Sequence, residues 1–359
     1  MRESRVMMWK AIAFACCLAP CCLWAAGESA PGGRRDVRAY NGRPTPPDVI
    51  QVYAHRAVRG LLPEHTLPGY AEALRIGCDY VDMDVNMTRD GVLVVTHDQT
   101  LNPDLTTDAT GKRVTARIPV NTLLCAELQR YNVGRLNRES DYGRLFPHQR
   151  DLDLASIPTL REVIRYVKGI AGDRVGFQIE IKTDPAHPEL SPTPKAYATA
   201  LHALLHEERV LDRTEIQAFD WRCLIELNRI DPKARTAYLT DRTTVSLTDA
   251  ETGLWTAGLL PKDYGYSLPR MVKSLGGSCW DPFEMDLTKA ALDEAHALGL
   301  KVVPWGWPEM EGNDFPHETI TRLIAWGVNG IITDRPDLLR DLLSAKGYAV
   351  PGGMGTRGP

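Results

Sequence analysis

Residues 49–85 read VIQVYAHRAVRGLLPEHTLPGYAEALRIGCDYVDMDV and contain the unit from which we expect the fold to be built. A β-branched run at 49–54 comes first, a helix-like stretch follows at 67–76, and a second β-branched run occupies 80–85. A strand, a helix and another strand in this order predict two parallel strands joined by a crossover helix.

The same alternation continues along most of the chain. Six more strand candidates occur at 175–181, 215–219, 236–239, 277–280, 301–305 and 330–333, with further helix-like stretches at 159–168, 196–208 and 287–298. Eight strand–helix units are the number that closes a parallel sheet into a barrel. The sequence therefore predicts an α/β fold, a (β/α)8 or TIM barrel, over residues 48–345.

Two features interrupt the simple repeat. Residues 92–96 are a candidate extra strand, joined to the second strand by the hairpin turn Arg89-Asp90-Gly91. Residues 99–156, which follow, are polar and contain glycine. We expect them to form a long loop insertion over one rim of the barrel, with a separate small domain as the alternative.

The ends of the chain differ from the barrel in composition. Arg2, Arg5 and Lys10 precede an uncharged run that ends in small residues, so we expect 1–26 to be a secretory signal peptide. The run is shorter than the ~20 apolar residues that span a bilayer, although an uncleaved anchor is the alternative. Residues 27–47 are a predicted disordered lead-in, and 346–359 a predicted flexible tail. We expect a periplasmic or secreted protein without a stable membrane anchor after signal cleavage.

Composition excludes two classes of partner. The formal net charge is -4 and the basic runs are two residues long, which argues against nucleic-acid binding. Outside the predicted signal peptide, the cysteines are widely spaced and form no CxxC pair, which excludes a zinc finger. Disulfides are allowed in an exported protein, but we expect most of these thiols to be small buried hydrophobes. The four cysteines are Cys78, Cys125, Cys223 and Cys279.

Ionisable and aromatic residues end one predicted strand after another. In a (β/α)8 barrel the carboxyl ends of the strands meet at one rim, where the active site is assembled from the loops that follow. We therefore expect these side chains to lie together. In chain order the strand ends read His55-Arg56, Asp82-Met83-Asp84, His97-Asp98, Glu180-Ile181-Lys182, Phe219-Asp220 and Pro304-Trp305.

The carboxylates among these residues indicate a metal site. Asp82 and Asp84 are two positions apart, so both point to the same side of their strand. Two such carboxylates repel each other unless a cation or a proton lies between them. Together with Glu180 they provide a set of oxygen ligands suited to Ca²⁺ or Mg²⁺. The alternative is that they are loop carboxylates that cap helices.

The histidines and the arginine indicate chemistry at phosphorus. Imidazole ionises near neutral pH, so His55 and His97 can serve as an acid–base pair. Arg56 carries a planar guanidinium that matches a phosphate group with two hydrogen bonds. A metal ion, a guanidinium and two imidazoles are the groups that in-line displacement at a phosphodiester requires.

The spacing of these motifs resembles the glycerophosphodiester phosphodiesterase family. The similarity runs in order from about residue 50 to 340. Its motifs are His55-Arg56, Pro63-Glu64-His65-Thr66, Asp82-Met83-Asp84, Thr88-Arg89-Asp90-Gly91, His97-Asp98, Glu180-Ile181-Lys182, Phe219-Asp220, Trp305 and Asn329-Gly330-Ile331-Ile332-Thr333-Asp334-Arg335-Pro336.

The resemblance implies a TIM-barrel enzyme that hydrolyses small-molecule glycerophosphodiesters to glycerol 3-phosphate and an alcohol. It implies that His55 and His97 are catalytic and that Arg56 and Lys182 bind the phosphate. Phe219 and Trp305 would form an aromatic wall beside the substrate, with core packing as the alternative for Trp305. A divalent metal ion would be held by the residues matching Asp82, Asp84 and Glu180. Glu64 would either bind the ion directly or contact a residue that binds it.

Three residues depart from the family pattern. Ala57 replaces the usual Gly after His-Arg, and Asp82 replaces the usual Glu of the metal pair, which shortens that side chain by one methylene. His65 replaces the usual Asn, and we expect it to lie at the surface near a helix start, with an extra polar group at the site as the alternative.

Two other functions compete with the diesterase. One is a phospholipase of D or C type acting on intact membrane lipid, with an apolar lip formed by Leu61-Leu62 and residues 254–260. The other is a catalytically silent barrel that holds a phosphorylated ligand, and the shorter carboxylate of Asp82 is the feature that favours it.

Overall fold

The computed structural model describes residues 44–245, 253–306 and 316–354. The predicted signal peptide, most of the predicted lead-in and the last five residues lie outside these ranges.

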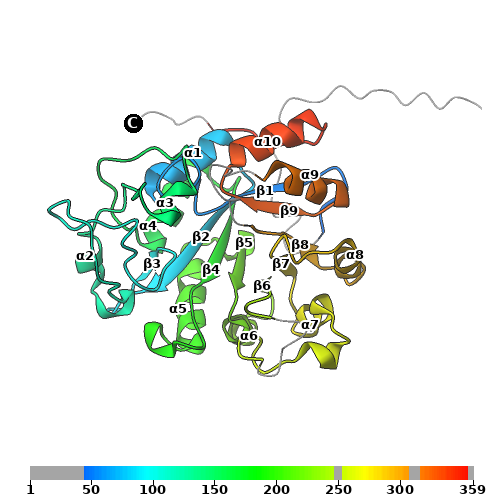
Figure 1. Cartoon of the computed structure of the whole chain (residues 1–359). Coiled ribbons are helices and arrows are strands. Elements are labelled where there is room, and N and C mark those ends of the chain that lie inside the picture. The colour runs from blue at the N-terminus through cyan, green and yellow to red at the C-terminus, as the bar shows by residue number, and fades with distance from the viewer. Residues whose placement is uncertain (1–43, 246–252, 307–315, 355–359) are drawn as a thin grey trace, which may run out of the picture. The chain divides into compact units, whose positions relative to one another are not determined.

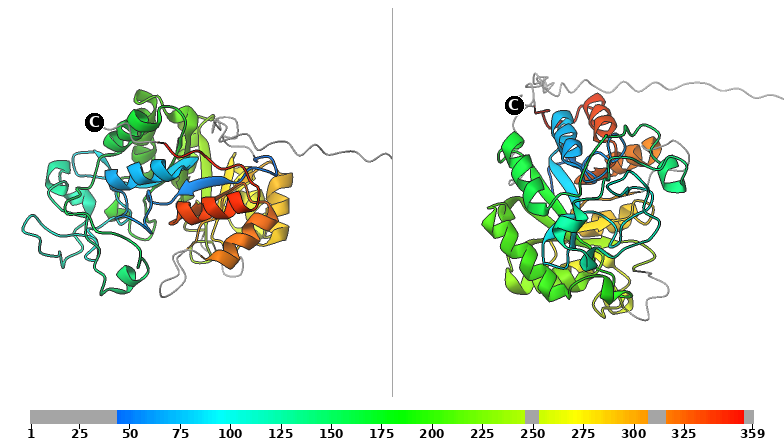
Figure 2. Two further views of the ribbon diagram at one scale, coloured as in Figure 1. Left: turned by 90° about the horizontal axis from the view of Figure 1, so that it is seen from above. Right: turned by 90° about the vertical axis from the view of Figure 1, so that its left-hand side faces the viewer.

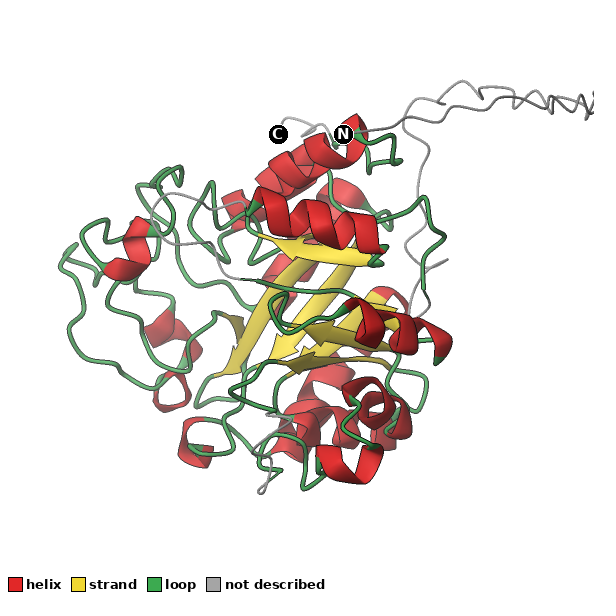
Figure 3. Cartoon of the chain, turned by 45° about the vertical axis from the view of Figure 1, so that its right-hand side comes forward, coloured by secondary structure: helices red, strands yellow, loops and turns green. Residues whose placement is uncertain are grey.

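In the described part of the chain, eight parallel strands form a nearly closed barrel, as predicted (Figures 1 and 3). They follow the order β8-β7-β6-β5-β4-β2-β1-β9. Between the two end strands, Asn329 N donates to Val302 O at 3.0 Å and Ile332 N to Pro304 O at 3.1 Å, which brings β9 against the β8 segment. The strands are β1 Gln51–Ala54, β2 Tyr80–Met87, β4 Gly176–Ile181, β5 Thr214–Ala218, β6 Arg235–Thr240, β7 Cys279–Pro282, β8 Lys301–Val302 and β9 Gly330–Thr333.

Helices surround the strands and cover their outer faces (Figures 2 and 3). Their sequences supply the expected end signals: Thr66 caps α1 through the Gly69 amide, and Thr159 and Glu162 form a reciprocal capping box on α4. The apolar side chains of helices and strands pack into one large core. The helices are α1 Leu67–Ile76, α4 Leu160–Ala171, α5 Pro194–Glu207, α6 Trp221–Ile230, α7 Leu268–Ser274, α8 Lys289–Ala297, α9 His317–Trp326 and α10 Pro336–Ala345, with short 3₁₀ turns η3 Pro188–Leu190, η4 Leu211–Arg213 and η5 Pro261–Tyr264.

The inside of the barrel carries a buried charge pair. Lys301 Nζ lies 2.8 Å from Glu215 Oε1, and both side chains are fully buried. The rings of Tyr53 and Tyr80 stack beside them with centroids 4.5 Å apart. A Cβ at Gly176 would come within 2.4 Å of the Tyr80 ring, so the absence of a side chain there makes room for it.

The insertion between β3 Leu93–Val95 and α4 lies to one side of the barrel (Figure 1). Strand β3 pairs with β2 in antiparallel fashion, as the hairpin turn predicts. The insertion contains η2 Val120–Thr122, α2 Cys125–Leu128 and α3 Asp141–Arg144. A small hydrophobic cluster joins Leu101, Val120 and Leu128 to Val94 of β3, so the insertion packs on the barrel hairpin.

The residues after α10 correct one prediction. Residues 346–354 belong to the described fold, whereas we expected a flexible tail from 346 onward. Met354 is buried, and its amide donates to Leu74 O of α1 at 2.9 Å. The apolar residues of this segment pack against the hydrophobic core, which the low sequence complexity of VPGGMGTRGP does not reveal.

The four described cysteines are free thiols, and Cys78, Cys223 and Cys279 are buried, as we expected of most of them. Among the residues that the structure describes, no helix has both the length and the apolar character needed to cross a bilayer.

Candidate active site

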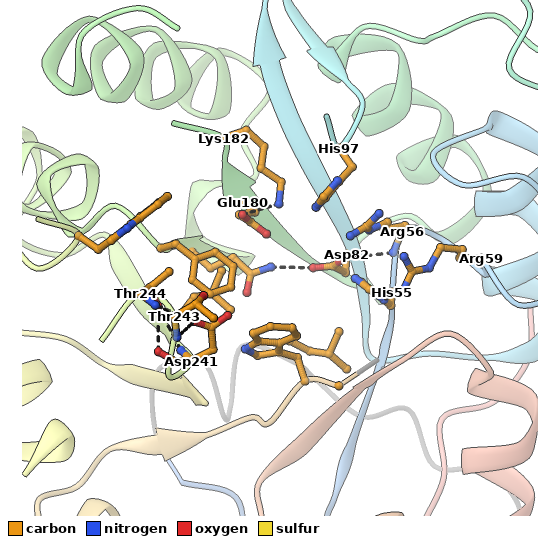
Figure 4. A pocket seen from close by; sticks show the side chains of 17 residues that line it. His55, Arg56, Arg59, Asp82, His97, Glu180, Lys182, Asp241, Thr243 and Thr244 are labelled. Atoms are coloured by element: carbon orange, nitrogen blue, oxygen red, sulfur yellow. Dashed lines mark hydrogen bonds and ion pairs between the residues drawn. The ribbon is translucent and has the colours of Figure 1, made fainter. Parts of the chain in front are cut away.

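A cavity of about 290 Å³ opens at the carboxyl ends of the strands (Figure 4). It is lined by eight of the residues predicted for the site: His55, Arg56, Asp82, His97, Glu180, Lys182, Phe219 and Trp305. The other two, Glu64 and Asp84, are buried behind the lining residues and contact Arg56. The loop after β6 adds Asp241, Thr243 and Thr244, which the sequence did not single out.

The backbone after β1 takes a conformation that side chains disfavour. Arg56 and Ala57 have φ angles of 46° and 73°, and His65 has a φ of 60°. These values lie in the left-handed region, where glycine has no steric cost. The turn brings the Arg56 amide within 3.1 Å of Asp82 Oδ1. Position 57 is therefore one where glycine would fit the backbone better than alanine.

Each catalytic candidate histidine is held by a carboxylate. His55 Nδ1 lies 2.7 Å from Asp334 Oδ1, and His97 Nδ1 lies 2.7 Å from Asp98 Oδ1. Because an ionised carboxylate only accepts hydrogen bonds, each Nδ1 carries a proton and each Nε2 is free to handle another. Arg59 in turn donates to both oxygens of Asp334 at 2.9 Å.

Electrostatics keep both imidazoles neutral in the free protein. Burial lowers the pKa of His55 and of His97 to about 4, against the opposing effect of their carboxylate partners. Burial alone would raise the pKa of Asp334, but the charges of Arg59 and His55 hold it well below its usual range. Each site histidine therefore has a bare nitrogen available at neutral pH.

The guanidinium of Arg56 is fixed by two carboxylates. Its Nη1 lies 3.2 Å from Glu64 Oε1, and its Nε lies 3.3 Å from Asp84 Oδ2. Glu64 also accepts a hydrogen bond from the Tyr142 hydroxyl, which comes from α3 of the insertion. Glu64 thus contacts Arg56 and Tyr142. Tyr142 was not predicted to reach the site, because no sequence pattern connects a residue of the insertion with Glu64.

Asp84 and Glu180 lie opposite each other on neighbouring strands. The β2–β4 register pairs them directly, and Lys182 Nζ lies 3.1 Å from Asp84 Oδ1 and 2.5 Å from Glu180 Oε1. His65 Nε2 lies 2.8 Å from Asp84 Oδ2, and the side chain is buried. The expected surface position of His65 is therefore wrong: the turn before α1 points the imidazole inward, toward a carboxylate.

Both oxygens of the Asp82 carboxylate accept hydrogen bonds. Its Oδ1 accepts from the Arg56 amide at 3.1 Å, and its Oδ2 accepts from Gln217 Nε2 at 2.7 Å. Gln217 lies on β5 two positions before Phe219, which directly follows the end of that strand, and both side chains line the cavity. The alternation of side chains along the strand could therefore have predicted that Gln217 lines the cavity.

The donor set fits a hard divalent cation by its chemistry. Burial, and then the charge of Asp84, raises the pKa of Asp82 to about 7. Burial raises the pKa of Glu180 to about 8 despite the neighbouring Lys182. Buried carboxylates that retain protons near neutral pH lack positive charge, which a divalent ion would provide. In the described part of the chain, no three acidic, histidine or cysteine side chains already converge as ligands of one ion.

Aromatic rings form the opposite wall of the cavity. Phe219 and Trp305 meet edge to face, with ring centroids 5.4 Å apart. Trp305 Nε1 donates to Asp281 O at 3.2 Å, which fixes the indole against β7. Trp305 thus both packs against its neighbours and lines the cavity, so the two roles considered for it coexist.

Comparison with known proteins places this geometry in a family. The model of the Glycerophosphoryl diester phosphodiesterase family matches residues 55–338. The chain belongs to this family. Members of the family generally use a divalent metal ion.

Individual family members and solved structures agree with the assignment. The glycerophosphodiester phosphodiesterase of Bacillus subtilis is 28% identical over 311 residues, which cover 86% of this chain and 91% of that protein. A crystal structure from Silicibacter pomeroyi, provisionally assigned as a glycerophosphoryl diester phosphodiesterase, is 32% identical with a TM-score of 0.76, covering 88% of this chain and 100% of that one. An Oleispira antarctica phosphodiesterase, solved with the product sn-glycerol-3-phosphate, shares the fold at 18% identity and a TM-score of 0.60, covering 82% of this chain and 97% of that one.

Proposed function

We propose that this protein hydrolyses glycerophosphodiesters to glycerol 3-phosphate and an alcohol. The observation that carries the proposal is the pair of carboxylate-held histidines, His55 and His97, lining one cavity together with Arg56. A phosphodiester bound there would place its charged oxygens against the guanidinium and its ester oxygens within reach of two imidazoles.

The residues divide the work as their chemistry dictates. Arg56, fixed by Glu64 and Asp84, binds the phosphate oxygens and holds them in one orientation. One imidazole accepts a proton from the attacking water through its bare Nε2. The other must first take up a proton at Nε2, as an imidazolium, and then delivers that proton to the leaving oxygen. Asp334 and Asp98 stabilise the imidazolium that forms during this exchange.

We further propose that the site binds Ca²⁺ or Mg²⁺ through Asp82, Glu180 and Asp84. Oxygen donors suit these ions, and the raised pKa values of Asp82 and Glu180 support the need for a cation. When bound, such an ion supplies positive charge to the phosphate oxygens. Lys182, which contacts Asp84 and Glu180, adds a further charge at the same edge.

The test is a substrate panel measured with and without chelator. The protein should release glycerol 3-phosphate from glycerophosphocholine, lose this activity in EDTA and regain it with Ca²⁺ or Mg²⁺. Activity unaffected by prolonged chelation would remove the metal from the proposal. No release from any phosphodiester at any metal concentration would refute the proposed reaction itself.

The apolar lip expected of a lipid-acting enzyme is formed only in part. Leu62 is buried with 7% of its surface exposed, whereas Leu254 is 45% exposed. A water-soluble diester is therefore the substrate class that we propose. Rates on micellar lipid well above those on the deacylated diester would contradict this choice.

We also propose that the protein works in the periplasm or outside the cell. The charged start, the uncharged run and the small residues within 1–26 support export. Fractionation of expressing cells should place the mature protein outside the cytoplasm, with its new N-terminus near residue 27. Full-length protein in the cytoplasmic fraction would contradict the proposal.

A further inference from the structure

Arg59 is a buried charge beside the catalytic candidates, and the division of work proposed above gives it no role. Its side chain is fully buried, although it belongs to the turn after β1 and not to a strand end. A buried guanidinium is destabilising unless other groups pair with it. The contacts of Arg59 therefore indicate what this charge does.

The guanidinium of Arg59 meets the Asp334 carboxylate edge to edge. Arg59 Nε donates to Oδ1 and Arg59 Nη2 donates to Oδ2, each at 2.9 Å. Asp334 Oδ1 also accepts from His55 Nδ1 at 2.7 Å, and Figure 4 shows Arg59 and His55 next to each other. Two parallel hydrogen bonds fix the plane of a carboxylate, which a single bond does not. Arg59 therefore determines the direction from which Asp334 meets the imidazole.

The insertion encloses Arg59 from the other side. The Arg59 Cζ lies 4.6 Å from the centroid of the Phe146 ring, and Phe146 is itself fully buried. The Tyr142 hydroxyl accepts from Arg59 Nη1 at 3.3 Å, and Gln149 Nε2 donates to the Arg59 carbonyl at 2.7 Å. An aromatic face against the guanidinium and hydrogen bonds at its edge restrict it to one position.

The charge of Arg59 also acts on the ionisation of Asp334. Burial raises the pKa of Asp334, and the charge of Arg59 then lowers it more than any other neighbouring group does, to well below its usual range. The carboxylate therefore remains ionised and can only accept a hydrogen bond. This keeps the proton of His55 on Nδ1 and leaves Nε2 bare.

Direct binding of the substrate phosphate is the other role open to a cavity arginine. Arg59 does line the cavity. Its side chain is 0% exposed, however, and its nitrogen atoms already contact Asp334 and Tyr142. The geometry therefore favours an action through Asp334 over contact with the substrate.

We propose that Arg59 is a positioning residue for His55 and that Phe146 holds Arg59 in place. Arg59 keeps the Asp334 carboxylate in the orientation that presents Nε2 of His55 to the substrate. Phe146 does not line the active-site cavity, so its effect on the reaction reaches the site through Arg59 alone. The inference rests on the proposed diesterase function, in which His55 is one of the two catalytic imidazoles.

Kinetics with glycerophosphocholine and saturating metal ion separate positioning from substrate binding. Arg59→Ala should lower kcat about tenfold and change KM less than about twofold, because an interaction that orients a catalytic group affects the transition state. Guanidinium chloride at a non-denaturing concentration should restore part of kcat, whereas the same concentration of NaCl should not. Phe146→Leu should lower kcat by a smaller factor, again with KM unchanged.

A double variant tests whether Arg59 acts through Asp334. Residues that act through one carboxylate are not additive, so Arg59→Ala combined with Asp334→Asn should be about as slow as Asp334→Asn alone. Multiplied effects in the double variant would overturn the inference. An unchanged kcat in Arg59→Ala would overturn it as well, as would a rise in KM as large as the fall in kcat.

A second buried arginine provides the matched control. Arg213 is also fully buried, its Cζ lies 5.1 Å from the centroid of the Phe177 ring, and neither residue lines the cavity. Arg213→Ala and Phe177→Leu should lower the free energy of unfolding but leave kcat of the folded protein unchanged. If Arg59→Ala does not fold, Arg59→Lys permits the same comparisons, because an ammonium group cannot make two parallel bonds to a carboxylate.

A measurement without turnover separates this inference from the proposed function. Nitrogen-15 NMR of His55 should show the proton on Nδ1 in the native protein and a mixture of both tautomers in Arg59→Ala. If the native protein cleaves no diester but this difference is observed, the proposed function fails and the positioning role stands. If folded Arg59→Ala retains the native tautomer, the positioning role is overturned whatever the activity.

Discussion

At the residue scale, the shortened carboxylate of Asp82 is the feature most open to a direct test. Both of its oxygens are occupied, by the Arg56 amide and by Gln217, and this keeps the group close to its strand. Asp82→Glu adds one methylene and should extend the carboxylate toward Glu180. We expect several-fold tighter binding of Ca²⁺ or Mg²⁺, measured by calorimetry on the metal-free protein. Weaker binding would show that the short side chain is the better ligand here.

The support of His55 gives a second prediction at this scale. Asp334 raises the pKa of His55 against the stronger effect of burial. Asp334→Asn should therefore move the His55 titration below its value of about 4, followed by NMR, because the imidazolium loses its counter-charge. For the same reason kcat should fall at least ~10-fold. Asp337→Asn, which removes a partner of Arg335 outside the cavity, is the control and should change neither quantity.

Whether a site residue could be predicted from the sequence depends on the element that carries it. The residues at strand ends were predictable, because parallel strands end at one rim and their motifs are short and ordered. Arg59 was not predictable, since it lies within the turn after β1 rather than at a strand end, and it acts by holding Asp334. The predicted surface position of His65 was wrong. The residues next to it in the sequence do not reveal that its backbone has a positive φ, which directs the imidazole inward.

At the element scale, the insertion contributes to the site through α3. The Tyr142 hydroxyl donates to Glu64 and accepts from Arg59 Nη1 at 3.3 Å. It therefore connects Glu64, which holds Arg56, with Arg59, which holds His55 through Asp334. Tyr142→Phe should raise KM roughly three- to tenfold, about the loss of one hydrogen bond to a charged group. The variant protein should still fold, because the remaining phenyl ring can pack edge to face on Phe146.

The control for this prediction lies in the same insertion. Tyr131 packs on the small cluster around Val120 and does not line the active-site cavity. Tyr131→Phe should leave KM unchanged. An equal rise in KM for both variants would indicate a general loosening of the insertion and would contradict the specific role of Tyr142.

The elements themselves differ in how predictable they were. Strands were marked by β-branched runs, and the helix predicted at 67–76 matches the bounds of α1 in the structure. The helices α2 and α3 have four residues each, too few to show a helical period, and the insertion therefore looked like a loop.

At the scale of the whole molecule, the stability of the barrel should be especially sensitive to mutation of the buried pair Lys301–Glu215. Lys301→Met leaves a buried carboxylate without its partner and should lower the free energy of unfolding by about 3–5 kcal/mol, measured by chemical denaturation. Replacing both residues by apolar ones, Lys301→Met with Glu215→Leu, should recover most of the loss. Equal destabilisation of the single and double variants would contradict this explanation.

The barrel as a whole was predictable, while its interior was not. Eight alternating units determine closure, but Lys301 at the start of a strand has the sequence appearance of an ordinary surface lysine. Its burial becomes apparent only when Glu215, 86 positions earlier, is placed opposite it across the closed sheet. Contacts of that separation depend on the tertiary fold, and local patterns carry no signal for them.

The measurement that tests the central claim most directly is the release of glycerol 3-phosphate from glycerophosphocholine by three proteins: the native chain, His55→Ala and His97→Ala. The native protein should release it in the presence of Ca²⁺ or Mg²⁺, and each variant should be slower by at least ~10²-fold, the scale of a lost acid or base. Circular dichroism of the variants should match the native protein. Folded variants that retain native rates would contradict the assignment of these two histidines as the catalytic pair.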